Sequence, residues 1–218
     1  SLGFAISSLI VGPVMAAPQG GVVASGTANI TVDGNNTNIN QTSGQATITW
    51  SEFDVLQNET VQFTVPNSDS YTLNLIGDAE ASRIQGTITS NGQVFLSNPN
   101  GLTFTGTSIV NVNGLIATTA NLTADATTAT FTGVANSTSA ITSAGTISAE
   151  GVVGFIAPNV NVTGGTITAS GMRLDNATNG TATITLANGI AFNLDDSASF
   201  IGDQQGINNS GTLISDGG

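Results

Sequence analysis

The 218-residue sequence predicts an all-β protein built as a parallel β-helix of about 20 residues per coil, with an N-terminal β cap and extra-helical β-hairpins. Three observations support this prediction. Apolar residues alternate with polar ones, a Gly-Thr motif recurs at a regular interval, and Asn and Gly mark tight corners between short apolar runs. No segment has the apolar stripe, with a period of roughly 3.6 residues, that an amphipathic helix requires.

The composition is typical of an extracellular β-rich protein. Charged residues make up 7% of the chain, which has neither His nor Cys, while hydrophobic residues reach 39%. Lack of Cys removes disulfides and thiolate metal sites. The net charge of −12 argues against partners such as nucleic acid or an anionic membrane surface, which attract clustered Lys and Arg. It is compatible with solubility and with a partner that presents a positive face.

Residues 1–16 are predicted to be a truncated secretory signal peptide. The run from Leu2 to Met15 is apolar and uncharged, and small residues at Val14 and Ala16 fit a cleavage site between Ala16 and Ala17. The basic segment that normally precedes such a run is missing. Gly and Pro interrupt the run, which is also too short for a membrane-spanning helix, so the alternative is a buried core segment.

Residues 17–80 are predicted to form the cap. Their apolar and polar residues alternate, as in Val61–Val65 and Tyr71–Leu75, but the regular ladder of Gly-Thr motifs is absent. Because a solenoid must shield its first coil, this segment is the natural candidate. Within it, Asp33-Gly34-Asn35-Asn36 lacks the full ligand spacing and the closing Glu of a calcium loop, so we expect a turn there.

Residues 81–205 carry the motif that predicts the coils. Gly-Thr followed by Ile or Leu begins at Gly86, Gly145, Gly165 and Gly211, with a one-residue variant at Gly106. The intervals between these glycines are 20, 39, 20 and 46 residues (86 to 106, 106 to 145, 145 to 165 and 165 to 211). Two single periods, one near-double period and one double period with extra residues indicate one repeat per coil.

The two long intervals predict insertions. Residues 121–143 are expected to form an extra-helical hairpin that covers one face, and residues 172–196 to form a strand, an Asn188-Gly189 turn and a second strand. Residues 206–218 are expected to start the following β-helical repeat region. The domain that contains the cap and the coils would therefore span residues 17–205.

The most informative segment runs from Asn91 to Leu102. In it, the apolar strand Val94-Phe95-Leu96 lies between two turn sequences, Asn91-Gly92 and Asn98-Pro99-Asn100-Gly101. Proline fixes φ near −65°, Asn tolerates positive φ, and Gly has no Cβ to clash in that conformation. The second turn is therefore predicted to be a corner between early coils of the helix.

Several segments, taken in order, resemble the secretion domain of two-partner secretion exoproteins, the filamentous haemagglutinin-like adhesins and haemolysins of Gram-negative bacteria. The segments are Trp50–Val55, Asn58–Phe63, Pro66–Ser68, Ser90–Leu102 and Val152–Pro158. The resemblance extends from about residue 20 to the end of the chain. It implies a capped, right-handed β-helix that carries an export signal and seeds folding of a long β-helical passenger.

The resemblance also implies partners and site residues. The partner is a dedicated outer-membrane transporter, whose periplasmic POTRA domains would recognise a monomeric domain on its way through the periplasm to the cell surface or medium. A host receptor would bind downstream regions. The implied secretion motif consists of Asn98, Pro99, Asn100, Gly101 and Leu102, with Pro66 and Asn67 in the family's other such stretch. These residues are expected either to contact the transporter or only to shape the fold.

A β-helical chain of this kind could also serve two other functions. One is the adhesive or structural passenger of a single-chain autotransporter. The other is a β-helical polysaccharide enzyme, whose carboxylates would need Lys, Arg or His around an anionic substrate. Asp195-Asp196 is the only adjacent acid pair, its side chains would point to opposite sides of a strand, and the chain has no Lys or His. We therefore expect no catalytic, cofactor-binding or metal-binding residues.

Overall fold

The computed structural model describes residues 18–125, 128–134, 137–176, 181–186 and 207–215. Every regular element in these ranges is a β-strand, and none of them contains a helix long and apolar enough to cross a membrane. The expected leader with its Ala16-Ala17 cleavage site, the Asn188-Gly189 turn and the Asp195-Asp196 pair lie outside the described residues.

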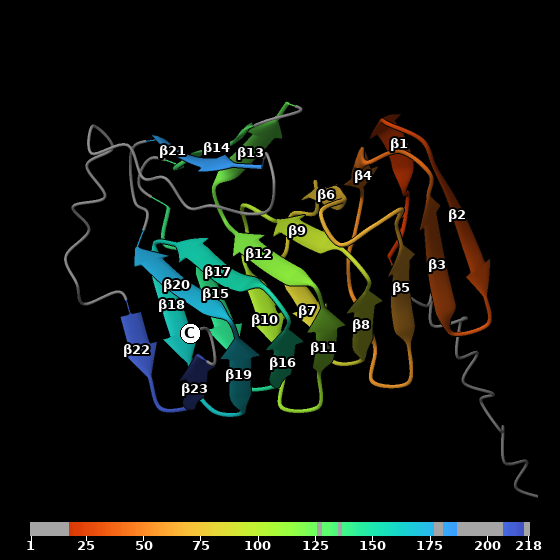
Figure 1. The fold of residues 1–218 in the computed structure, drawn as a ribbon. Coiled ribbons are helices and arrows are strands. Elements are labelled where there is room, and N and C mark those ends of the chain that lie inside the picture. The colour runs from red at the N-terminus through yellow and green to blue at the C-terminus, as the bar shows by residue number, and fades with distance from the viewer. Residues whose placement is uncertain (1–17, 126–127, 135–136, 177–180, 187–206, 216–218) are drawn as a thin grey trace, which may run out of the picture.

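Three sheets form the faces of a prism, and each sheet is named here after one central strand (Figure 1). The β9 sheet contains, in spatial order, β1 (Val22–Ser25), β4 (Gln45–Trp50), β6 (Tyr71–Ile76), β9 (Gln93–Ser97), β12 (Gly114–Thr118), β17 (Val152–Ala157) and β20 (Gly171–Asn176). The β8 sheet contains β2 (Ala28–Asp33), β3 (Asn36–Gln41), β5 (Thr60–Thr64), β8 (Thr87–Ser90), β11 (Ile109–Val112), β16 (Thr146–Ala149), β19 (Thr166–Ala169) and β23 (Thr212–Ser215). The β10 sheet contains β7 (Ser82–Ile84), β10 (Leu102–Phe104), β15 (Ala140–Ser143), β18 (Asn159–Val162) and β22 (Ile207–Asn209).

The chain visits these sheets in a fixed order, which makes the fold a parallel β-helix, as predicted. One coil runs through β8, β9 and β10, and the next through β11, β12 and β15. Equivalent strands pair in parallel from coil to coil. The β8 sheet aligns Thr87, Ile109, Thr146, Thr166 and Thr212 in one row.

Alternation along each strand places apolar side chains inside the prism. In the β8 sheet, Ile88, Val110, Ile147 and Ile167 occupy one aligned row and are completely buried. Burial of each such side chain stabilises the fold by about 1.5–3 kcal/mol. The rings of Phe104 and Phe155 stack across the core with centroids 5.8 Å apart. The core is therefore a column of like residues, repeated once per coil.

The Gly-Thr repeat marks a corner of the prism, but not at every coil. The Ile109 amide donates to the Gly86 carbonyl oxygen and the Thr146 amide donates to that of Ser108, so Ser108 occupies the place that Gly86 holds one coil earlier. The prediction that Gly106 heads its repeat is therefore wrong. A small residue that fits the corner, rather than glycine itself, is what the coil requires.

Parallel pairing begins earlier than the expected end of the cap at residue 80. Strand β3 already pairs in parallel with β5, and β4 with β6. Among the described strands of the three prism sheets, only β1 and β2 run antiparallel to their neighbours, β4 and β3. Within residues 22–80, the antiparallel capping strands are thus limited to residues 22–33. The turn between β2 and β3 is Gly34-Asn35, with Gly34 at a φ of 56°, which agrees with a turn at this point.

A fourth sheet lies outside the prism, over the β9 sheet (Figure 1). The hairpin of β13 (Asn121–Ala124) and β14 (Thr128–Thr132) pairs with β21 (Thr181–Thr185). It covers a second apolar cluster, in which Phe131 and Leu122 pack with Phe95 and Ile116. Because β15 and β20 belong to the prism, the insertions are narrower than residues 121–143 and 172–196.

Candidate functional site

The secretion-motif corner is centred on the buried side chain of Asn98, which follows β9. Its Nδ2 donates to the carbonyl oxygen of Glu80 and to Oγ of Ser82, both at 3.0 Å. Its Oδ1 accepts from the amide of Asn100 at 2.9 Å. All three side-chain bonds are formed in a site from which water is excluded, since Asn98 has no exposed surface. A buried carboxamide with unmet bonds would be strongly destabilising, so this geometry fixes the corner.

The backbone of Asn98 connects the same corner to the following coil. Its amide donates to the carbonyl oxygen of Thr118 at 3.0 Å, while its own carbonyl oxygen accepts from the amide of Gly101 at 3.0 Å. The side chain reaches back to Glu80 and Ser82, in the preceding coil. Asn98 therefore joins three successive coils at one point.

The rest of the motif divides between core and surface. Leu102 is completely buried at the start of β10, and Gly101 has a φ of 123°, a conformation that L side chains rarely adopt. A Cβ on Gly101 would lie 3.1 Å from the carbonyl oxygen of Ala140. By contrast, Pro99 is half-buried and Asn100 is exposed, with its Nδ2 donating to the Asp78 carbonyl oxygen at 2.6 Å. Only Pro99 and Asn100 are thus accessible to a partner.

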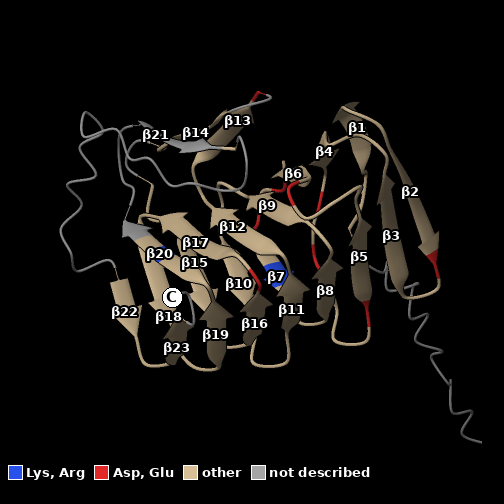
Figure 2. Ribbon diagram, in the orientation of Figure 1, with Lys and Arg blue, Asp and Glu red and all other residues tan. Residues whose placement is uncertain are grey.

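Carboxylates gather beside this corner, among the acidic residues drawn in red in Figure 2. Partial burial, followed by repulsion from Asp54 and Asp78, raises the pKa of Glu52. Burial also raises the pKa of Asp54, although the Arg83 amide donates to its Oδ1 at 2.6 Å. These acids are not among the site residues predicted from the sequence. The only sequence signal for this group is weak: acidic residues follow β4 and follow β6, one coil apart.

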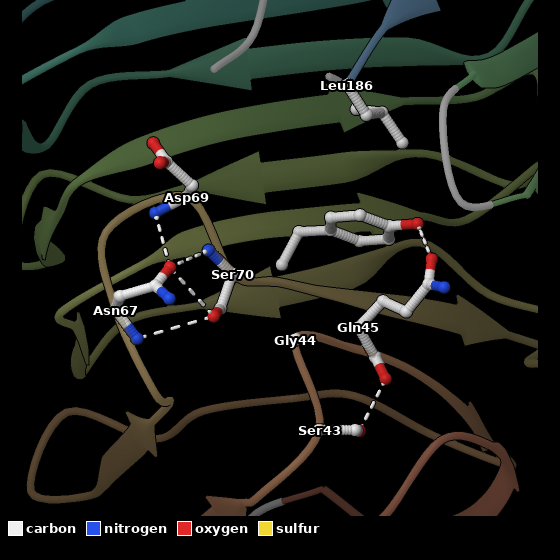
Figure 3. A pocket seen from close by; sticks show the side chains of 8 residues that line it. Ser43, Gly44, Gln45, Asn67, Asp69, Ser70 and Leu186 are labelled. Atoms are coloured by element: carbon white, nitrogen blue, oxygen red, sulfur yellow. Dashed lines mark hydrogen bonds between the residues drawn. The ribbon is translucent and has the colours of Figure 1, made fainter. Parts of the chain in front are cut away.

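The other expected stretch, Pro66-Asn67, forms a separate turn. Oδ1 of Asn67 accepts from the Asp69 amide at 3.1 Å and from the Ser70 amide at 3.0 Å, as Figure 3 shows. The turn precedes β6, whereas the Asp78 and Glu80 contacts of the Asn98 corner follow it. The two stretches are therefore separated by the length of β6, about 20 Å at roughly 3.3 Å per residue. The fold does not bring them together.

A cavity of about 420 Å³ lies beside the Asn67 turn. The Tyr71 hydroxyl group on its wall donates to Gln45 and, at 2.7 Å, to the Asp125 carbonyl oxygen, and burial followed by the Asp125 charge raises the pKa of Tyr71. The residues that line it are Ser43, Gly44, Gln45, Asn67, Asp69, Ser70, Tyr71 and Leu186 (Figure 3). The cavity therefore lies where the capped end meets the extra-helical sheet.

The described residues offer no obvious catalytic chemistry. Among them, no three His, Cys, Asp or Glu side chains are grouped so that they could hold a metal ion. The hydroxyl groups of the chain have no His or Lys to activate them. What the two turns offer is hydrogen-bonding surface rather than a reaction centre.

Comparison with known proteins agrees with the resemblance found in the sequence. The family model of the TPS secretion domain matches residues 14–218. A heme/hemopexin-binding protein of Haemophilus influenzae (strain ATCC 51907 / DSM 11121 / KW20 / Rd) is 43% identical over 105 residues, which are 48% of this chain and 12% of that protein. A second heme/hemopexin-binding protein of Haemophilus influenzae is 44% identical over 84 residues, which are 38% of this chain and 9% of that protein.

The fold has a solved relative. The crystal structure of the HMW1 secretion domain from Haemophilus influenzae matches with a TM-score of 0.76 and 30% identity, over 92% of this chain and 54% of that chain. The matched residues thus make up about a tenth of the heme/hemopexin-binding proteins and about half of the crystallised HMW1 chain.

These matches favour two-partner secretion over a single-chain autotransporter. A domain of this kind works with a cognate outer-membrane transporter, and its exoprotein reaches the cell surface or the extracellular space. The chain belongs to the TPS secretion domain family and serves as the secretion domain of a two-partner secretion exoprotein.

Proposed function

We propose that the POTRA domains of the cognate transporter bind this domain in the periplasm and that the domain acts by binding, not by catalysis. The observation that carries the proposal is the division of the secretion motif. Asn98 and Gly101 are buried and stabilise the packing of adjacent coils. Pro99 and Asn100 lie at the surface beside carboxylates from two coils. An exposed polar corner next to negative charge suits a partner with a complementary positive face.

The proposal extends to folding at the cell surface. The capped end of the prism carries the antiparallel strands β1 and β2, whereas the other end presents β20, β22 and β23. At that second end, Leu213 continues the core row of Ile167 but is 36% exposed, and Ile207 is only partly buried against the core. A parallel coil added there would bury these side chains and pair with the strand edges, so the domain would seed the downstream passenger. Host-receptor binding is assigned to those downstream residues.

The experiment is a pull-down of residues 17–218 with the purified POTRA domains, comparing wild type with Asn100→Ala and Asn98→Ala. Circular dichroism accompanies each variant. Asn100→Ala is expected to keep its fold and to bind more weakly, because it removes only an exposed side chain. If folded Asn100→Ala binds as tightly as wild type, recognition through this corner is wrong.

Export provides the second test. Co-expression with the transporter should release the domain into the medium, and omission of the transporter should retain it in the cell. Mass spectrometry of the exported protein should find Ala17 at its N-terminus if the leader is cut after Ala16. Transporter-independent release would contradict the proposed route.

A further inference from the structure

Strand β2 (Ala28–Asp33) is the free edge of the largest sheet. It lies at one end of the strand order of the β8 sheet and pairs with β3 alone among the described strands (Figure 1). All six of its residues are in register with β3, without a bulge. A regular edge of this kind presents a row of backbone donors and acceptors that a further strand can pair with.

The hydrogen-bond pattern identifies the groups that face outward. The Thr42 amide donates to the Thr27 carbonyl oxygen at 2.9 Å, so this position is a hydrogen-bonded pair of the antiparallel ladder. Hydrogen-bonded and non-hydrogen-bonded pairs alternate along such a ladder. The amide and carbonyl groups of Ala28, Ile30 and Val32 therefore point away from β3, toward the open edge.

The side chains at this edge indicate what kind of strand would fit. Ile30 and Val32 lie on the core side of the sheet, opposite Ile39 and Thr37, which are buried. Val32 nevertheless remains 59% exposed, because no coil covers it. A strand added beside β2 would cover Val32 with its own apolar side chain while it pairs with the backbone. One added β-strand would therefore both pair with the open backbone groups of β2 and cover its exposed apolar side chain.

The other edge strands of the three prism sheets are less suited to such pairing. The register of β1 is broken between Val23 and Ser25, and β7 has only three residues, beside which the Val55 amide donates to the Arg83 carbonyl oxygen at 3.0 Å. Edges β20, β22 and β23 lie at the end where we expect downstream coils to add. Strand β2 also lacks the Lys, Pro and bulge by which proteins usually block an edge.

We propose that β2 is the docking edge for an extended strand of the transporter's periplasmic domain, an inference that rests on the function proposed above. A second copy of this chain is a poorer occupant. Each copy has a net charge of −12, so two copies repel each other at the short separation that pairing of two β2 strands requires. The β2 edge also lies at the capped end, away from the end where we expect downstream coils to add.

The test uses a proline that blocks the edge and spares the cap. Val32→Pro removes an amide that faces outward and makes no bond to β3, and edge strands tolerate proline at such positions. Val32→Thr is the matched control, because it keeps the amide and a β-branched side chain. Binding of residues 17–218 to the POTRA domains is measured by calorimetry, with circular dichroism on every variant.

We expect Val32→Pro to weaken binding about ten-fold or more, and Val32→Thr to weaken it by less than about three-fold. Because the lost contact is between uncharged backbone groups, the difference should persist at high salt. A folded Val32→Pro variant that binds like wild type would overturn the docking edge and leave the proposed function standing. Failure of wild type to bind would instead remove the proposed function itself.

Amide exchange followed by NMR gives an independent readout on unmodified protein, in case the proline disturbs the cap. Addition of POTRA domains should protect the amides of Ala28, Ile30 and Val32, whereas no gain in protection would overturn the inference. Sedimentation tests the competing occupant. A wild-type dimer that Val32→Pro abolishes would mean that a second copy occupies β2, which also overturns the inference.

Discussion

Replacing Asn98 with Ala removes the side chain that joins adjacent coils at the secretion-motif corner. Two donated bonds and one accepted bond disappear, and the Ser82 hydroxyl is left in a site with no exposed surface. At about 1–1.5 kcal/mol for each donated bond and about 0.5 kcal/mol for the bond from Asn100, the free energy of unfolding should fall by about 3 kcal/mol. Asn100→Ala removes one exposed bond and should lower it by about 0.5 kcal/mol.

Urea unfolding of both variants, followed by Trp fluorescence, measures these values. Trp50 is the only Trp in the chain, is 3% exposed, and packs edge-on against Phe53, so its emission should shift when the early coils open. With a slope of about 2–3 kcal/mol per molar urea, Asn98→Ala should shift the midpoint by about 1–1.5 M and Asn100→Ala by about 0.2 M. Equal shifts in the two variants would refute the assignment of Asn98 as the structural half of the motif.

Three further predictions follow from the same geometry. Gly101→Ala should lower stability by about 1–3 kcal/mol in a thermal melt, since Ala is strained at positive φ; an unchanged melting temperature would contradict the backbone assignment. Glu52 and Asp54 have raised pKa values in the fold, so the folded state binds protons more tightly than the unfolded chain, and these groups favour the fold as pH falls through their folded pKa values. Asp78→Asn removes a negative charge that repels both carboxylates, so it should make the stability depend less on pH. The difference between the urea midpoints at pH 7 and pH 4.5 should become smaller. An unchanged difference would show that Asp78 does not act on Glu52 and Asp54. Phe131→Ala should lower the free energy of unfolding by about 3–5 kcal/mol, because it removes a buried ring. The amides of β13 and β14 should then exchange with solvent while those of β9 and β12 stay protected. Simultaneous loss of protection in all four strands would mean that the outer sheet and the prism unfold as one unit.

The coil architecture could be predicted from the sequence because its determinants are local and repeated. Each Gly-Thr corner and each alternating strand carries its own signal, and the same signal returns in the next coil. The prediction that a repeat begins at Gly106 fails for a physical reason. Ser108 also fits the corner, where its Oγ donates to the Thr105 carbonyl oxygen at 2.8 Å, so the position is set by strand pairing and not by the visible glycine.

The contacts of the candidate site could not be predicted, because they join residues that no local pattern relates. Ser82 and Glu80 precede Asn98 by 16 and 18 residues, and the pairing that makes them neighbours exists only after the coils stack. Likewise, β21 adds to β14 across an interval that contains several strands of the prism. The turn sequence predicted a corner correctly; which half of it would be buried depended on the neighbouring coils.

The cap on the prism gives the molecule a direction. Strands β1 and β2 begin the stack, so the downstream coils of the same chain can add only at the other end, where each added coil pairs with the coil before it. Reversing one coil breaks several such bonds, each worth about 0.5–1.5 kcal/mol, besides exposing its core residues. When such a chain emerges from a pore, every finished coil opposes backward diffusion. Folding of successive coils would therefore favour outward over backward movement of the chain.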